Sequence, residues 1–420
     1  MKYLNSERLN IKIPKYEEVI NAFIPSEIYI PLCENVKPLK IGTKVKEGDV
    51  FSTSQDISIR SSIPGSVVEL KRVSMPNGKI EDVAVVKMQG AFSYEGKKNI
   101  KSEWTLFSSS KILSLLEENG VHNTFFGYEN VKSLEKEIDY SKKVALGVRL
   151  YDYDPSCITD SFLFKNYFEK IIEGAFIVAK GLNLSNVYFF YSPEQSKIIK
   201  NLPSFEEFVD FNSTFIQVLN QKFSFGTKEE LNSLISRKTN VTCCFVDSST
   251  CLASYEAVAL CKPVVDSYVQ VSGSLLGEEK FFKIKRGTLI KNLIEECGLC
   301  KKEPYKIVIN GLLKGVSISD SNTPITDYVK SITVLSLKET AEQKQRACIR
   351  CGDCFRSCPV GIKPFSLFSM YYFDIKIPED IKKLASLCTQ CGRCNTVCPS
   401  RIPLYQTISL ICRQENETKV

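Results

Sequence analysis

Eight cysteines near the C-terminus form two copies of one spacing, and this repeat constrains the chain more than any other feature. Each copy reads C-x2-C-x2-C-x3-C-P, over residues 348–359 and again over 388–399. Every position of the second copy lies forty residues after its counterpart in the first. Such a repeat indicates a ligand framework rather than scattered thiols. Its members are Cys348, Cys351, Cys354, Cys358, Cys388, Cys391, Cys394 and Cys398.

The spacing of these cysteines is typical of 4Fe–4S clusters. Three thiolates separated by two residues can hold one side of an iron–sulfur cube, and the fourth must come from farther along the chain. In two-cluster ferredoxins the fourth ligand belongs to the other motif. We therefore assign Cys398 to the cluster held by the first three cysteines of the 348–359 motif. Cys358 then completes the cluster held by the first three cysteines of the 388–399 motif.

Zinc and disulfides explain the repeat less well. Zinc sites usually combine two well-separated C-x2-C pairs, and a disulfide framework has no reason to recur at forty residues. The first residues, MKYLNSERLNIKIP, lack the apolar core of a secretory signal, so we expect a reducing compartment. No apolar run is long enough to span a bilayer, and Thr242–Cys261, the most apolar stretch, is interrupted by charges.

Charge and composition exclude other functions. The net charge is +7, but the basic residues are scattered rather than clustered with aromatic residues, which disfavours nucleic-acid binding. The chain has one histidine, His122, for which a catalytic role is conceivable, but a plain loop residue is the favoured interpretation. With no nucleophile motif beside it, we assign no catalytic residue. Trp104 is expected to lie in a core.

Helical patterns join the two cysteine motifs. Apolar residues fill 365–373, and Ile381, Leu384 and Leu387 recur at helical spacing after Pro378. This predicts the α-helical type of ferredoxin for residues 339–420.

The N-terminal part, residues 1–100, is expected to be all-β over 28–90, where short strands alternate with turn residues. It resembles the barrel-sandwich hybrid of biotinyl and lipoyl domains. Those domains carry a modified lysine on a hairpin, but the corresponding turn here is Ser54-Gln55-Asp56, so no swinging arm is expected.

Residues 101–275 alternate helical and strand patterns, which predicts a Rossmann-like α/β domain with a mainly parallel sheet. Ligands of such sheets bind at the carboxyl ends of the strands. The expected helix covers 164–178, and the expected strands are 144–150, 187–191, 215–219 and 242–246.

Residues 276–338 resemble a β-grasp module of the SLBB (soluble-ligand-binding β-grasp) type. Strands are expected at 282–284, 307–309 and 332–335, with a helix over 289–294. Cys297 and Cys300 end this helix. A redox pair is conceivable there, but burial or chance spacing is the favoured interpretation. The whole fold is thus expected to be multidomain α+β.

The order of these parts, together with their motifs, resembles the RnfC subunits of Rnf complexes, which are membrane-bound, ion-translocating oxidoreductases that couple ferredoxin and NAD. The most specific match is CIRCGDCFRSCPVGIKP with CTQCGRCNTVCPSRIPL, and further matches lie at 253–273 and 311–335. The α/β part also resembles the flavin-binding subunit of respiratory complex I.

The resemblance implies that FMN and NADH bind in the α/β part, through a loop resembling GxGGAGFPT. Residues 120–127, GVHNTFFG, depart from that loop. Glycines there would let backbone amides approach phosphates, whereas Phe125 and Phe126 place rings in that space. We therefore expect FMN and NADH binding to be lost or strongly weakened.

A second family motif, resembling NxxExEP, implies cofactor-binding roles for Asp152 and Asp154. Arg149 stands where the family has asparagine. The competing interpretation is a solvated strand end.

The resemblance implies an electron-transfer subunit that relays electrons through two 4Fe–4S clusters, and the altered loop at 120–127 disfavours independent NADH dehydrogenase activity. Its expected partners are the other subunits of a membrane electron-transport complex, with ferredoxin as a further candidate. Its expected place is the cytoplasmic face of the cell membrane, as a peripheral subunit without a span. The alternatives are a soluble or microcompartment-associated flavin or cobalamin reductase-like shuttle, and a scaffold whose clusters only hold the fold.

Overall fold

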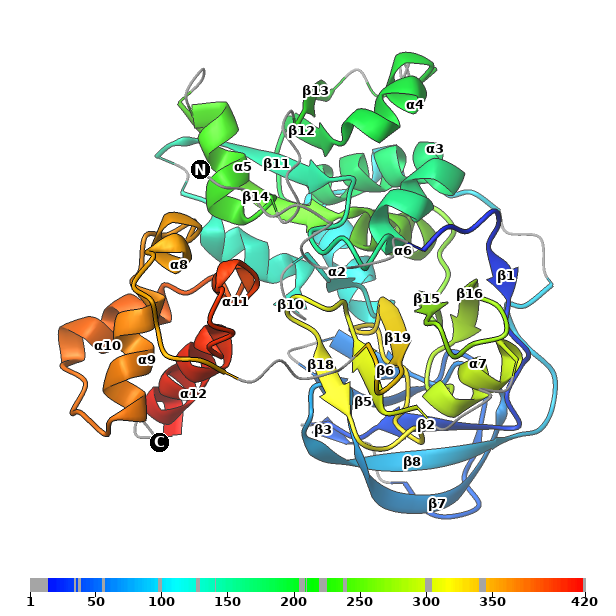
Figure 1. The fold of residues 1–420 in the computed structure, drawn as a ribbon. Coiled ribbons are helices and arrows are strands. Elements are labelled where there is room, and N and C mark those ends of the chain that lie inside the picture. Colours follow the sequence, from blue (N-terminus) through cyan, green and yellow to red (C-terminus); the bar gives the residue numbers. More distant parts are fainter. Residues whose placement is uncertain are drawn as a thin grey trace.

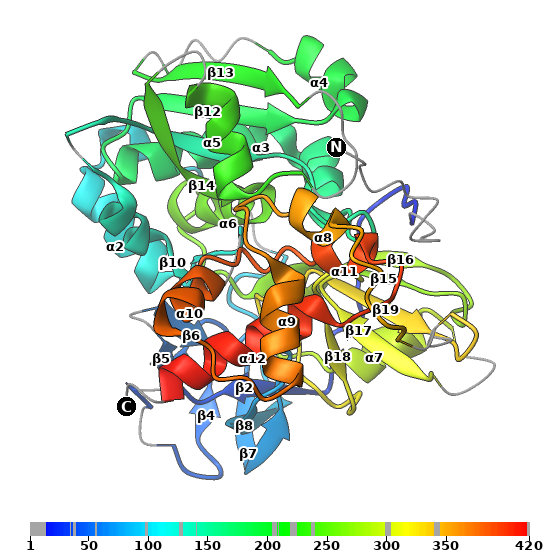
Figure 2. The same ribbon diagram turned by 60° about the vertical axis from the view of Figure 1, so that its left-hand side comes forward.

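The computed structural model groups two β-rich parts and an α/β layer, and places a set of C-terminal helices against them (Figure 1). Figure 2 shows the same helices, drawn orange to red, in front of the strands of the other parts. The structure describes residues 14–417 except 34, 37–38, 55–56, 97–99, 126–128, 140, 204–207, 209, 219–224, 237–239, 299–303 and 340–344.

The N-terminal part is built from two small antiparallel sheets, which confirms the all-β prediction for 28–90. Ile28, Phe51 and Val67 face each other in its buried core, because alternate residues of a strand share one face. The predicted hairpin turn at 54–56 lies largely outside the described residues. One sheet orders its strands as β2 (Glu27–Pro31), β8 (Ile80–Met88), β7 (Gly65–Ser74) and β4 (Lys44–Val45), and the other as β3 (Asn35–Val36), β5 (Val50–Ser54) and β6 (Ile57–Arg60).

The α/β layer contains a four-stranded sheet in the order β13-β12-β11-β14, and all its strands are parallel. This confirms the predicted mainly parallel sheet. The strands are β11 (Lys143–Arg149), β12 (Asn186–Tyr191), β13 (Asn212–Gln217) and β14 (Val241–Asp247). Its helices are α2 (Ser109–Glu118), α3 (Thr159–Gly181), α4 (Ser196–Lys200), α5 (Lys228–Ser236) and α6 (Ser248–Val258).

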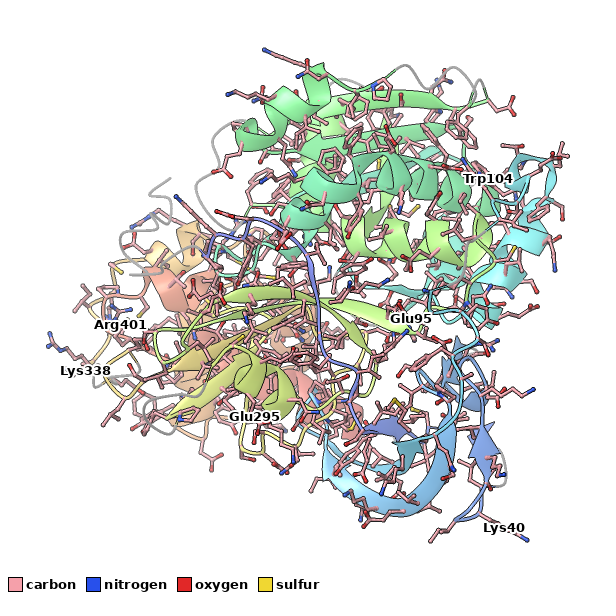
Figure 3. All side chains as sticks on the ribbon, turned by 90° about the vertical axis from the view of Figure 1, so that its right-hand side faces the viewer. Lys40, Glu95, Trp104, Glu295, Lys338 and Arg401 are labelled. Atoms are coloured by element: carbon pink, nitrogen blue, oxygen red, sulfur yellow. The ribbon has the colours of Figure 1, made fainter. Side chains whose placement is uncertain are left out.

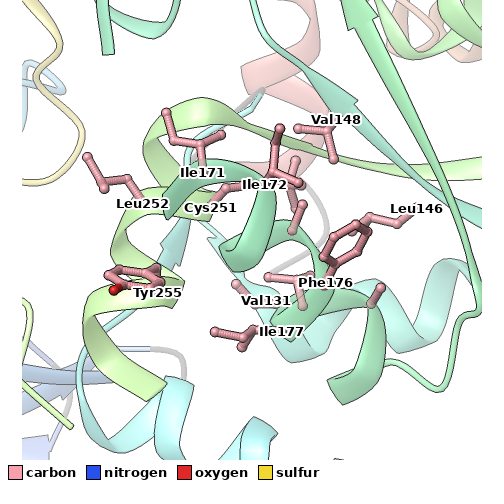
Figure 4. Close-up of a cluster of buried hydrophobic side chains, with 14 of the residues drawn as sticks. Val131, Leu146, Val148, Ile171, Ile172, Phe176, Ile177, Cys251, Leu252 and Tyr255 are labelled. Carbon is pink, nitrogen blue, oxygen red and sulfur yellow. The ribbon is translucent and has the colours of Figure 1, made fainter. Parts of the chain in front are cut away.

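Helix α3 packs against α6 in the largest buried core, shown in Figure 4. Ile171 and Phe176 of α3 and Leu252 of α6 are at most 2% exposed. Burial of each such side chain contributes roughly 1.5–3 kcal/mol. Gly174 lets the two helices approach closely, because a Cβ atom there would overlap with the carbonyl oxygen of Cys251. Trp104 is also buried in this core, as predicted, and donates a hydrogen bond to a carboxylate.

The third sheet draws strands from distant parts of the sequence. Its order is β1-β16-β15-β19-β17-β18, and the predicted boundary at 275 falls between β15 and β16, which are neighbours in it. Cys297 ends helix α7 and is buried in the core of this sheet, whereas Cys300 lies outside the described residues. The elements are β1 (Ile20–Asn21), β15 (Asp266–Ser272), β16 (Lys280–Lys285), α7 (Ile290–Glu296), β17 (Lys306–Ile309), β18 (Val316–Ile318) and β19 (Ser331–Leu335).

The C-terminal region is helical, as predicted, and its two cysteine motifs have the same backbone conformation. Gly352 and Gly392 cap short helices with φ of 75° and 72°, a conformation that favours glycine. Arg350 and Gln390 also match, with φ of 55° and 52°. The helices are α8 (Asp353–Arg356), α9 (Pro364–Tyr372), α10 (Glu379–Ser386), α11 (Arg393–Val397) and α12 (Leu404–Glu417).

Throughout the part of the chain that the structure describes, helices fall short of the length and apolar character needed to cross a bilayer.

Candidate functional site

The thiols of the second motif gather around a small cavity together with Cys358 of the first motif. Cys388, Cys391 and Cys394 line this cavity with Cys358. Burial raises the pKa of the Cys394 thiol, and the nearby Cys391, Cys388 and Cys358 thiols raise it further. Four mutually repelling thiolates in one place suit a ligand of high positive charge.

The remaining cysteine of the second motif lies with the first motif. Cys398 packs in one apolar cluster with Cys348 and Cys354, and Cys394 of the second motif belongs to the same cluster. Burial raises the pKa of the Cys354 thiol, and the charges of Cys398 and Cys351 add to this effect. Cys358 thus lies beside the thiols of the second motif, and Cys398 lies beside Cys348 and Cys354 of the first.

The donor set fits iron–sulfur clusters better than single ions. Among the described residues, no three cysteine, histidine, aspartate or glutamate side chains are close enough to hold one metal ion. A cube of four irons is larger than one ion and keeps its thiolates farther apart. Four cysteines are also the usual ligand set of such a cube.

The second motif is fixed to the α/β layer. Arg393 of α11 forms two charged hydrogen bonds with Glu230 of α5, at 2.5 and 2.7 Å. The Tyr153 hydroxyl donates a hydrogen bond of 3.3 Å to the carbonyl oxygen of Cys391. Gly392 lies against the carbonyl oxygen of Leu313, where a side chain would not fit. The second set of thiols thus faces the interior of the molecule.

A cleft of about 670 Å³ adjoins this second set. It is lined by side chains from every part of the molecule and reaches Cys388. A cleft of this size can hold a small molecule. Its polar lining includes Glu81, Thr124, Arg149, Asp152, Asp154, Asp160, Asn310, Lys314, Lys330, Thr389 and Gln390.

Asp152 lines the cleft, but its carboxylate binds the chain's own backbone. It accepts hydrogen bonds from the amides of Asp160 and Ser161, at 3.0 and 2.9 Å, and one from the Ser161 hydroxyl at 2.7 Å. It therefore caps the N-terminus of α3, where amides lack partners within the helix. Burial raises the pKa of Asp152 to about 7, and the charge of Asp160 contributes.

Asp154 also serves the fold. Its carboxylate accepts hydrogen bonds from the amide and hydroxyl of Ser156, at 2.9 and 2.6 Å, and from the amide of Leu313 at 2.7 Å. The side chain is only 4% exposed. The interpretation as a solvated strand end was therefore wrong for Asp154, whereas Asp152 stays partly exposed in the cleft. Burial against 313 removes Asp154 from water, and the sequence carried no sign of this distant contact.

The segment 120–125 is tightly bonded to its surroundings. The Thr124 hydroxyl contacts Asp247, and the Thr124 amide donates a hydrogen bond of 3.0 Å to the Thr250 hydroxyl. The Phe125 amide donates to the side-chain oxygen of Asn123 at 3.2 Å. These amides are thus already occupied by the chain's own groups. Residues 126–127 of the predicted loop lie outside the described residues.

Phe125 fills space at the end of the parallel sheet. Its ring is 3% exposed and stacks on Phe245, with centroids 5.3 Å apart. The Arg149 guanidinium also contacts this ring, 4.3 Å from its centre. Arg149 donates a further hydrogen bond of 3.1 Å to the carbonyl oxygen of Gly226. The Phe125 ring and the Arg149 guanidinium thus fill this end of the sheet together.

His122 was interpreted as a plain loop residue, and this was wrong. It lies in a short strand, β9 (His122–Asn123), which pairs with β10 (Glu129–Asn130). Its side chain is buried, and its Nδ1 atom lies 2.5 Å from the Asp327 carboxylate, which also pairs with Arg286 at 2.7 Å. Residue 327 lies far along the chain, so local sequence could not reveal this pairing.

A buried ion cluster links the third sheet to the α/β layer and was missed from the sequence. The Lys330 ammonium lies 2.7 Å from Asp160 and 2.6 Å from Asp247. Burial by itself would raise the pKa of Asp247, but the charge of Lys330 together with hydrogen bonds from Lys330 and Thr250 lowers this pKa below its ordinary value. Lys314 lies in the same cleft, where burial, aided by the charge of Arg149, lowers its pKa to about 8.

These features indicate an iron–sulfur protein, and the comparison of the C-terminal region with known families agrees. Residues 344–402 match the family described as "4Fe-4S dicluster domain".

The curated homologues of the chain are RnfC-type subunits of ion-translocating oxidoreductase complexes, which confirms the resemblance found in the sequence. Such a subunit of the "Proton-translocating ferredoxin:NAD(+) oxidoreductase complex" of Clostridium ljungdahlii is 25% identical over 82% of this chain and 78% of its own length. Its counterpart in the "Ion-translocating oxidoreductase complex" of Rhodobacter capsulatus is 26% identical over 51% of this chain. The counterpart from Vibrio cholerae is 22% identical over 84% of this chain.

The chain spans only 43% and 47% of the Rhodobacter and Vibrio proteins. Among solved structures, one titled "Crystal structure of NAD+-reducing [NiFe]-hydrogenase in the H2-reduced state" covers 74% of this chain, with 11% identity and a TM-score of 0.47. The chain covers 63% of that structure, and the similarity is too low to support a conclusion about function.

Proposed function

We propose that this chain is an electron-transfer subunit of an ion-translocating oxidoreductase complex and relays electrons through two 4Fe–4S clusters. The observation that carries the proposal is the exchange of the fourth thiol. Cys358 lies with the second motif, and Cys398 lies with the first. A shared exchange of this kind holds two clusters close together in one folded unit, as a relay requires. The names of the homologues support the same assignment.

The ligands of the two clusters follow from this proposal. Cys348, Cys351, Cys354 and Cys398 hold the first cluster, and the second is held by Cys358, Cys388, Cys391 and Cys394. When bound, the clusters supply reversible one-electron chemistry. The chain's own residues hold them in place, since the Arg393 ion pair and the Tyr153 hydrogen bond fix the second motif to the α/β layer.

The FMN and NADH function of the family is lost or strongly weakened in this chain. A phosphate cradle needs backbone amides that point at the ligand. The amides of Thr124 and Phe125 are instead bonded to Thr250 and Asn123. The Phe125 ring and Arg149 close the same corner, while Asp152 and Asp154 bind amides of their own chain. The described residues at this corner therefore do not fit the phosphates of FMN or NADH.

Further parts of the proposal concern organisation and location. The N-terminal part is a barrel-sandwich hybrid (1–100), followed by the α/β domain (101–275), an SLBB-type β-grasp (276–338) and the ferredoxin domain (339–420). The chain lies at the cytoplasmic face of the cell membrane as a peripheral subunit and contacts other subunits of its complex, with ferredoxin as a further partner. The homologues' names do not favour a microcompartment shuttle.

The decisive experiment is anaerobic purification with reconstituted iron and sulfide. We expect about eight iron atoms per chain, in two 4Fe–4S clusters that dithionite reduces. Flavin extraction should yield none, and NADH should leave the cluster spectrum unchanged. One FMN per chain with NADH-dependent bleaching would contradict the loss of the nucleotide site. Clusters that resist reduction by dithionite would favour a purely structural role.

A further inference from the structure

The two cysteine motifs share their backbone conformation but differ in what surrounds them. Among the proposed ligands, Cys391, Cys394 and Cys398 are buried, whereas Cys348, Cys351, Cys354, Cys358 and Cys388 are partly exposed. The second motif is covered by the α/β layer and the third sheet. Three of the four proposed ligands of the first cluster are partly exposed, against two of the second, and the less covered first motif is therefore the one nearer to solvent.

Apolar side chains are exposed next to the first set of thiols. Ile349, which follows Cys348, is 68% exposed, and Phe355, which follows Cys354, is 46% exposed. The corresponding residues of the second motif, Thr389 and Asn395, are polar and only partly exposed. Leu387, which precedes Cys388, is 56% exposed as well, but at the positions that follow the first and third cysteines apolar exposure is confined to the first motif, and it is typical of a contact surface.

The first motif is also cationic. Its stretch 345–363 has Asp353 as its sole acidic residue, and Asp353 lies 2.6 Å from Arg356. In the second motif, 385–403, the two basic residues are Arg393, which is buried against Glu230, and Arg401. The exposed basic residues of the first motif are Arg346, Arg350, Arg356 and Lys363.

We propose that this surface, which we call the first-motif face (Ile349, Arg350, Phe355 and Arg356), docks a partner protein that presents an acidic surface over its own redox centre. The inference rests on the proposed relay function. One electron passes from the reduced first cluster to the oxidised centre of the partner, and no bond or proton is exchanged. The apolar pair provides the dry centre of a small contact, and the surrounding guanidinium groups attract and orient an acidic protein.

The charge of the face selects this partner over others. A basic protein would be repelled, and an uncharged one would gain nothing from the cationic rim. The second cluster cannot provide the same contact, because the Arg393–Glu230 pair and Tyr153 cover its motif. The inner cluster therefore faces the cleft, and the outer cluster serves the partner.

The test uses dithionite-reduced holoprotein mixed in a stopped-flow instrument with two acceptors, acidic plastocyanin and basic cytochrome c. We expect faster reduction of plastocyanin, at a rate that falls as salt is added. Arg350→Glu should slow plastocyanin reduction about tenfold and speed that of cytochrome c, and Ile349→Ser should slow plastocyanin reduction with little change in the salt dependence.

Two control variants match these changes at a distant site. Lys40→Glu reverses an exposed charge on the N-terminal part, which Figure 3 shows far from Arg401 of the second motif. Ile80→Ser removes an apolar side chain that is 64% exposed, close to the 68% of Ile349. Both should leave the rates unchanged. Iron and sulfide content, measured for every variant, shows whether the clusters are intact.

Several outcomes would overturn the docking proposal. One is an equal rate of plastocyanin reduction for Arg350→Glu and wild type, with the clusters intact. Another is a loss of rate in Lys40→Glu as large as that in Arg350→Glu. If Arg350→Glu instead abolishes flotation with phosphatidylcholine–phosphatidylglycerol vesicles and leaves plastocyanin reduction unchanged, the face binds lipid. Reduction of a neutral quinone by the reduced protein separates failure of the docking proposal from failure of the relay function. If quinone reduction persists while the Arg350→Glu charge reversal has no effect on plastocyanin reduction, docking fails and the relay function stands. If the protein does not reduce the quinone, the relay function itself fails.

Discussion

Glu230 of α5 and Arg393 of α11 meet across 163 residues of sequence, in a bidentate contact at 2.5 and 2.7 Å. Arg393 lies between two proposed cluster ligands, Cys391 and Cys394. The side chains are only 13% and 10% exposed, so water weakens their attraction little. This contact holds the cluster-bearing helices against the α/β layer.

Breaking this pair should loosen the cluster region without removing its clusters. In Glu230→Gln the Arg393 guanidinium stays buried without its counter-charge, which we expect to cost on the order of 2–4 kcal/mol. Hydrogen exchange should rise in α5 and α11, while iron content stays unchanged. The control is Lys382→Gln, which breaks an exposed pair with Glu379 and should cost under about 1 kcal/mol. Equal exchange in both variants would contradict the proposed role.

The exchanged fourth ligands can be tested by pairs of alanine variants. Cys358→Ala with Cys388→Ala removes two ligands from one cluster, so about four iron atoms per chain should remain. Cys358→Ala with Cys348→Ala removes one ligand from each cluster and should leave far less iron. Iron analysis and electron paramagnetic resonance of the reduced proteins measure this. Ligation within each motif alone predicts the opposite result.

Lys314 should make stability depend on pH in the alkaline range. Burial, aided by the charge of Arg149, lowers its pKa to about 8 from an ordinary value of 10.5. The unfolded chain therefore holds the proton more tightly, so the free energy of unfolding should rise from about pH 8 to about pH 10.5. Lys314→Met should remove this rise and stabilise the protein at pH 7 by on the order of 1–3 kcal/mol. Urea unfolding at several pH values tests this, and parallel curves for the two proteins would contradict it.

Gly174 should be indispensable to the packing of α3 on α6. A methyl group in Gly174→Ala would overlap with the backbone of Cys251, and backbone moves less easily than side chains. We expect a loss of about 1–3 kcal/mol in the free energy of unfolding, followed through the fluorescence of Trp104, the single tryptophan. Gly181→Ala, where the new atom would meet only side chains at 3.2 Å, should cost less. A smaller effect at 174 than at 181 would refute this account.

Local patterns predicted the elements of the fold but not how they combine. The strand β11 and the helix α3 were expected within a few residues of their observed bounds, because alternation and helical spacing depend on near neighbours. The membership of β15 in the third sheet was not expected. The pairing of β15 with β16 and β19 depends on which strand edges are free in the folded chain, and the local sequence pattern of β15 does not predict this.

The same limit applies to the site. The motif positions of Asp152 and Asp154 were identified from the sequence, but their surroundings were not. Their carboxylates bind amides that the tertiary structure brings to them, such as that of Leu313, 159 residues away. The surroundings of His122 and Lys330 likewise depend on distant partners. His122 lies against Asp327, and Lys330 lies against Asp247.

The sequence by itself determined the cysteine chemistry, because the spacing of thiols within a few residues sets which metal group they can hold. It also determined that residues 120–127 lack most of the glycines of the loop GxGGAGFPT with which they were compared. Only the tertiary structure decided which motif faces the interior and which faces solvent. Two motifs of equal spacing differ in this respect because Glu230 and Tyr153 cover one of them, and such burial arises from contacts between residues far apart in the chain.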